Sequence, residues 1–156
     1  MPFDADDHGY RGLGYLLLHA QKEYLKAALC EFSEAIKLDP NGSPYYSSRG
    51  SVHQALGMYD DALSDYSKAI DIRPKADYYN SRGCVYLAQG NYDDAIADFN
   101  KAISLNPDFA WAYASLGKAY WHLGQKERAE ECFKKAVGME QDASSIKYEW
   151  EKFKAA

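Results

Sequence analysis

The chain has 156 residues, with 23 acidic and 18 basic side chains and a net charge of −5. This length fits one domain, and the basic residues form no cluster, which argues against a nucleic-acid-binding surface. No apolar run reaches the ~18 to 20 residues of a membrane span, and the three cysteines form no CxxC or CxxH spacing, so we expect reduced thiols and a cytoplasmic protein.

The N-terminal part of the chain is the least regular. Residues 1–8 are acidic and unpatterned, and we expect a frayed or disordered end there. Residues 9–42 form unit one, and helical spacing marks its second helix through Ala28, Phe32 and Ala35, before Pro40.

The first helix of unit one has two possible registers. Without gaps, Gly12 falls where later units carry an aromatic residue. Alternatively, Arg11-Gly12 and Tyr15 align with Arg82-Gly83 and Tyr86, which requires about one extra helical turn before Leu25. The sequence leaves both registers open.

Units two, three and four are regular and cover residues 43–75, 76–109 and 110–142. In unit three, Tyr79, Gly83 and Tyr86 mark a first helix, and Gly90 breaks it. One face of the second helix then carries Tyr92, Ala95, Phe99 and Ala102. The predicted helices are Pro44–Leu56, Tyr59–Ile72, Asp77–Gln89, Tyr92–Leu105, Trp111–Leu123 and Lys126–Met139.

Residues 143–156 predict one more amphipathic helix. Ile146, Trp150 and Phe153 fall at i, i+4 and i+7, which places them on one face. We expect this helix to cover the apolar face that the last unit would leave bare.

The period of the units is nearly constant. Pro40, Pro74 and Pro107 are 34 and 33 positions apart, which indicates stacked supersecondary units. The pattern resembles the tetratricopeptide repeat family, which unit four matches through Tyr113, Leu116-Gly117, Tyr120, Ala129, Phe133 and Ala136. The closing proline of the family pattern is replaced by Gln141.

The resemblance implies an all-α fold, a right-handed α-solenoid of four helix-turn-helix repeats with a C-terminal capping helix. It also implies a protein–protein interaction module, an adaptor or scaffold without enzymatic activity or cofactor. In the family, first helices line a concave groove that holds an extended peptide or a partner helix.

The resemblance places one set of candidate partner-binding residues on this groove. Two tryptophans on one groove wall would be exposed unless a partner covers them, and side-chain amides and hydroxyls suit hydrogen bonds to a peptide backbone. The candidates are Leu17, Ser47, Ser51, Gln54, Asn80, Cys84, Leu87, Trp111, Lys118 and Trp121.

A known subclass of the family grips the C-terminal carboxylates of heat-shock chaperones with lysine, asparagine and arginine. The corresponding positions here are Leu13, Leu17, Ser48, Asp77 and Ser81. With the frame moved by one repeat they are Ser47, Ser51, Ser81, Trp111 and Ser115. Neither set supplies a cation, so we predict that this carboxylate clamp is absent.

Two units carry a compensated charge. Arg49 and Arg82 stand where the family usually has leucine, and Asp65 and Asp98 follow 16 positions later. Because an unpaired buried charge is costly, we predict the salt bridges Arg49–Asp65 and Arg82–Asp98 between the two helices of each unit.

No catalytic or metal site is predicted. His19 and His53 fall near the positions of later tyrosines and replace them in packing, and no HxxxH or HExxH pattern occurs. Two other roles remain open besides the adaptor: self-association through unit one or the last helix, and docking or regulation within an enzyme complex. The partner is a protein or peptide of unknown identity, and a homo-oligomer is compatible with the sequence.

Overall fold

The computed structural model describes residues 5–139 and 143–155, and of residues 5–20 it describes the backbone alone. All regular structure in these ranges is helical, which confirms the all-α class. The helices are α1 (Ala5–Leu38), α2 (Ser43–Ala55), α3 (Tyr59–Ile72), α4 (Ala76–Ala88), α5 (Tyr92–Leu105), α6 (Ala110–His122), α7 (Lys126–Met139) and α8 (Ser144–Ala155).

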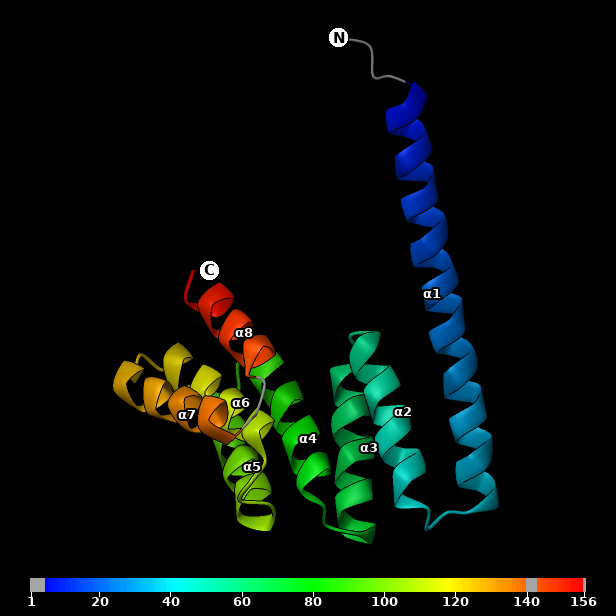
Figure 1. The fold of residues 1–156 in the computed structure, drawn as a ribbon. Helices are drawn as coiled ribbons and strands as arrows, with labels where there is room; N and C mark the ends of the chain where they lie inside the picture. Colours follow the sequence, from blue (N-terminus) through cyan, green and yellow to red (C-terminus); the bar gives the residue numbers. More distant parts are fainter. Residues whose placement is uncertain (1–4, 140–142, 156) are drawn as a thin grey trace.

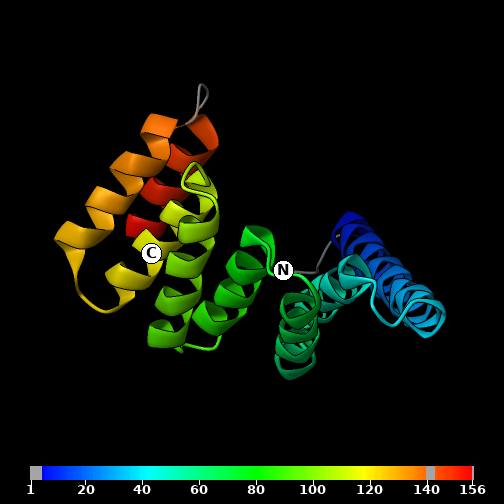
Figure 2. The ribbon, with the colours of Figure 1, turned by 90° about the horizontal axis from the view of Figure 1, so that it is seen from below.

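The helices stack in chain order into a solenoid (Figure 1). Units two, three and four are the antiparallel pairs α2/α3, α4/α5 and α6/α7, and every predicted boundary of these six helices lies within one residue of the observed one. Seen from below, the pairs follow one another from the N-terminal to the C-terminal half of the molecule (Figure 2).

Glycine sets both the turn and the close approach in each pair. Gly57, Gly90 and Gly124 have φ of +74°, +78° and +74°, a left-handed conformation that ends each first helix. A Cβ on Gly83 would lie 2.7 Å from the Phe99 ring. The three nearest atoms all belong to this ring, which lies one helical turn after Ala95 on α5.

Unit one differs from the expected helical hairpin. Its residues lie in one continuous helix, α1, whose N-terminal half extends beyond the other helices (Figure 1). The turn glycine of the later units is missing, because Glu23 stands 34 positions before Gly57. Without a residue that favours positive φ, the helix has no stop signal there. Residues 5–8, expected to be frayed, belong to α1, and residues 1–4 lie outside the described range.

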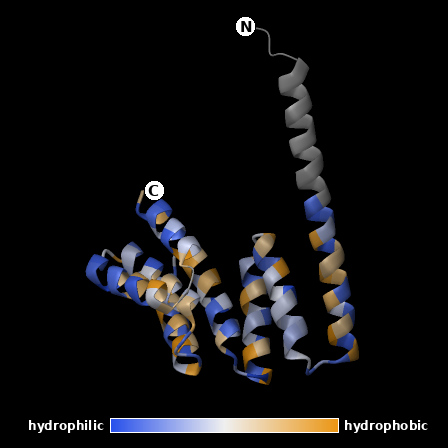
Figure 3. Cartoon of the chain, viewed as in Figure 1, coloured by the Kyte–Doolittle hydropathy of each residue, from blue (hydrophilic) through white to orange (hydrophobic). Residues whose placement is uncertain are grey.

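The last helix covers the end of the solenoid. Ile146 of α8 is 2% exposed and packs with Ala110, Phe133 and Ala136. Hydrophilic and hydrophobic residues alternate along the coloured helices of Figure 3. None of the described helices is both long and apolar enough to span a bilayer.

Candidate peptide-binding wall

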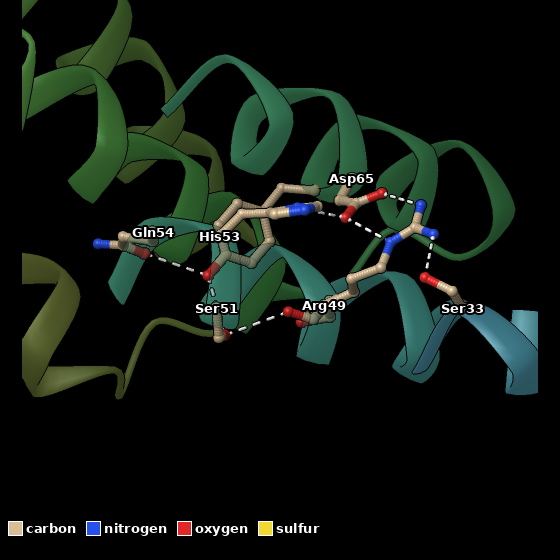
Figure 4. Close-up of polar contacts among 8 residues, drawn as sticks. Ser33, Arg49, Ser51, His53, Gln54 and Asp65 are labelled. Carbon is tan, nitrogen blue, oxygen red and sulfur yellow. Dashed lines mark hydrogen bonds and ion pairs between the residues drawn. The ribbon is translucent and has the colours of Figure 1, made fainter. Parts of the chain in front are cut away.

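The two predicted salt bridges are confirmed. Nε of Arg49 donates to Oδ2 of Asp65 over 2.9 Å, and Nη2 donates to Oδ1 over 2.7 Å, as Figure 4 shows. Arg82 makes the same two bonds to Asp98, both at 2.8 Å. The hydrogen bonds that the guanidinium groups donate to the aspartates raise the pKa of both arginines. Because these donors are engaged within the fold, we assign both arginines a structural role.

Each arginine also reaches the preceding unit. Nη1 of Arg49 donates to Oγ of Ser33 in α1 over 3.1 Å (Figure 4). Nη1 of Arg82 donates to Oγ of Ser67 in α3 over 2.9 Å. Ser33 precedes Ser67 by one repeat period, so the C-terminal half of α1 takes the place of a second helix in unit one.

His53 does more than replace a tyrosine. Nδ1 of His53 lies 3.0 Å from Oδ2 of Asp65, where the two groups form a hydrogen bond. Asp65 therefore meets two partners on α2, Arg49 and His53 (Figure 4). Sequence spacing alone gave no sign of this second contact.

On α2 two of the predicted wall residues, Ser51 and Gln54, already have internal partners for their side chains. Oγ of Ser51 lies 2.9 Å from the hydroxyl of Tyr66, and this hydroxyl donates to Oε1 of Gln54 over 3.1 Å. Ser51 also donates to the carbonyl oxygen of Ser47 over 3.1 Å. Burial raises the pKa of Tyr66, so its hydroxyl stays protonated and Ser51 and Gln54 serve to satisfy it.

On α4 the wall is mixed. Sγ of Cys84 lies 3.9 Å from Oγ of Ser115 on α6. Cys84 and Leu87 both pack against a core formed by residues of α5, α6 and α7. Burial raises the pKa of the Cys84 thiol. Asn80 differs from both, because its Oδ1 is buried and has no hydrogen-bond partner in the described part of the chain.

On α6 one of the two predicted exposed tryptophans is covered. Trp111 is 42% exposed, as expected. Trp121 is partly buried, because its ring packs edge-on against Trp150 of α8 with centroids 5.1 Å apart. Nζ of Lys118 on α6 lies 3.6 Å from Oε2 of Glu149, which is also on α8. The helix α8 thus stacks on α6 where a further first helix would lie.

Leu17 and the capping helix also bear on the sequence-based site. Leu17 lies in α1, but its side chain is outside the described residues. The sequence predicted the capping helix from Ile146, Trp150 and Phe153, but the pattern did not indicate which wall it would cover. Within the described residues no group of histidine, cysteine and acidic side chains could hold a metal ion.

Comparisons with known proteins agree with this arrangement. Family models described as tetratricopeptide repeat match residues 43–75 and 112–142, and one described as TPR repeat matches residues 83–124. The chain is 33% identical to small glutamine-rich tetratricopeptide repeat-containing protein 2 of Saccharomyces cerevisiae over 123 residues, which is 79% of this chain and 26% of that protein. It therefore spans about a quarter of this relative's length.

Two solved structures are similar in fold. The crystal structure of MamA protein is 30% identical with a TM-score of 0.69, and the match covers 78% of this chain and 67% of that one. The first TPR of Spaghetti (RPAP3) bound to the HSP90 peptide SRMEEVD is 24% identical with a TM-score of 0.66, covering 72% and 90%.

Proposed function

Because the chain belongs to the tetratricopeptide repeat family, we propose that it is a protein-interaction module that binds a peptide segment or partner helix along α2, α4 and α6. The observation that carries this proposal is the unpaired Oδ1 of Asn80. Buried polar atoms without a partner are rare in folded proteins, and a backbone N–H of a bound segment would satisfy this one.

Trp111 is the proposed apolar anchor. Its ring is 42% exposed near the start of α6, and large aromatic side chains are frequent centres of binding energy. Trp121 no longer fits this role, because Trp150 covers it. A fold similar to this one holds an HSP90 peptide in Spaghetti, which supports peptide binding in general terms.

We further propose that the module lacks the carboxylate clamp. None of the clamp positions carries a cation, and the one lysine among the predicted wall residues, Lys118, pairs with Glu149. Tight binding of a chaperone C-terminal peptide that is lost on amidation of its carboxylate would contradict this. We also propose a cytoplasmic protein, since all three of its cysteines are free thiols, and a module without catalytic activity of its own.

The test is affinity capture of partners by the full chain and two variants. Trp111→Ala and Asn80→Ala are expected to reduce capture of the same partner by about tenfold or more, with unchanged circular dichroism. Tyr24→Ala serves as the matched control, because Tyr24 is an exposed aromatic residue on α1. Unchanged capture by both wall variants would refute the proposed anchors.

Self-association is a second candidate, favoured by one observation on α1. Ala28, Phe32 and Ala35 are partly buried, whereas their counterparts in α3, Ala62, Tyr66 and Ala69, are at most 1% exposed. A second copy packed on α1 would complete this burial. Light scattering over a concentration series tests it, and a constant monomer mass would rule it out.

A further inference from the structure

Unit four lacks the buried link that closes units two and three. In unit three the link consists of Arg82, Asp98 and Ser67. The equivalent residues of unit four are Leu116, Cys132 and Asn100. All three line one hollow of about 690 Å³, whose lining residues come from α5, α6 and α7. The space that a guanidinium group fills in the other units is therefore open here.

The hollow has an apolar floor and aromatic walls. Leu116 and Tyr120 are nearly buried beneath it, and the ring of Tyr113 forms a further wall. In unit three the corresponding tyrosines, Tyr79 and Tyr86, lie 5.7 and 6.0 Å from the guanidinium of Arg82. In unit four the two equivalent tyrosine rings therefore have no arginine side chain of α6 between them.

The rim of the hollow is basic. Arg128 lies 4.4 Å from the centroid of the Tyr120 ring, and Nζ of Lys135 lies 5.5 Å from that of Tyr113. Lys134 adds a third cation, and Glu131 is the single acidic residue in the lining. None of the three cations forms an ion pair with a carboxylate in the described part of the chain.

We propose that this hollow is a second binding site, which accepts a carboxylate attached to an apolar or aromatic body. The carboxylate would lie at one of the two cations, Arg128 or Lys135, which stand two helical turns apart on α7. The body would rest on Leu116 between the two tyrosine rings. A cationic ligand fits less well, because Cys132 replaces the aspartate that pairs with arginine in unit three. Burial raises the pKa of Cys132, so this thiol stays neutral.

The same chemistry has two sources, a free organic acid and the C-terminal residue of a peptide. We suggest N-acetyl-phenylalanine and its amide as a matched probe pair, followed by nitrogen-15 NMR on the full chain. The acid is expected to cause saturable shifts at the amides of Leu116, Tyr120 and Cys132, and the amide to bind about fivefold more weakly or worse. A short peptide ending in phenylalanine forms the second arm. Binding of that peptide but not of the free acid assigns the site to protein C-termini, whereas binding of the free acid but not of the peptide assigns it to free acids.

Two variants separate this site from unspecific contact. Leu116→Arg combined with Cys132→Asp rebuilds the link of unit three, fills the hollow and is expected to abolish the shifts in a folded chain. Arg128→Gln combined with Lys135→Gln keeps the shape, and the preference for acid over amide should fall to about one. Wild-type binding by the filled variant would overturn the proposal, as would equal binding of acid and amide by the wild-type chain.

Discussion

The salt bridge between Arg82 and Asp98 allows the sharpest test of the fold, because unit four supplies its apolar replacement. The side chain of Asp98 is 8% exposed and that of Arg82 is 20% exposed. Replacing Arg82 by leucine would leave a buried carboxylate without a cation, and we expect a loss of about 3 kcal/mol in the free energy of unfolding.

Removing the aspartate is expected to cost less. In Asp98→Cys the guanidinium of Arg82 keeps its hydrogen bond to Ser67 and its contacts with two tyrosine rings. The Arg82 side chain is also 20% exposed, so water reaches it. We therefore expect a loss of about 2 kcal/mol.

The double variant should be milder than either single change. Arg82→Leu with Asp98→Cys reproduces the Leu116 and Cys132 pair of unit four, where the neighbouring Phe133 is 2% exposed and well packed. We expect a loss of about 1 kcal/mol, so the coupling between the two sites is about 4 kcal/mol. Urea denaturation followed by circular dichroism at pH 7 measures all four chains. Additive losses would refute the reasoning, and a changed denaturant slope would show that the folded or unfolded state has altered.

The remaining predictions concern packing and pH. Gly83→Ala is expected to lower the free energy of unfolding by about 1–3 kcal/mol in urea denaturation, because its Cβ would lie 2.7 Å from the ring of Phe99. Trp121→Ala is expected to lower the stability by about 2 kcal/mol and Trp111→Ala by less than about 0.5 kcal/mol, because α8 covers the first ring alone; equal losses would contradict this placement of α8. Stability is expected to fall above pH 10, because burial raises the pKa of Tyr66 above its usual value of 10.0. Only the unfolded chain releases the proton just above that pH, so the stabilisation is complete below pH 10 and is lost as pH rises through the folded-state pKa. Tyr66→Phe should show a shallower decline in denaturation series across that range.

Local signals account for most of the predicted fold. The break at Gly90 and its counterparts is readable because a left-handed turn favours glycine, and the periodic small and aromatic residues then fix both helices of a unit. The absence of a turn glycine in unit one would likewise have predicted the continuous helix α1. Glu23 occupies the position of the turn glycine, and this substitution was visible in the sequence.

The salt bridges were predictable because both partners vary together within one repeat period. The cover over Trp121 was not, because it depends on where a separate helix packs. The triplet Ile146, Trp150 and Phe153 shows that α8 has an apolar face, yet packing against α6 or against α7 alone would satisfy that face equally well in the sequence. Only the tertiary arrangement places Trp150 between Trp121 and Phe133.

Internal contacts divide the predicted wall into two levels. Ser51, Cys84 and Lys118 occupy equivalent positions in the last two turns of α2, α4 and α6. Each contacts a residue on another helix: Ser51 contacts Tyr66, Cys84 contacts Ser115, and Lys118 contacts Glu149. Asn80 and Trp111 lie earlier in their helices and keep an unpaired oxygen and an exposed ring. Groups that already hold the solenoid together would have to break those contacts to bind a ligand. Partner selectivity should therefore reside in the first two turns of α4 and α6. Exchanging Ser51 or Cys84 should then alter stability, whereas exchanging Asn80 or Trp111 should alter binding.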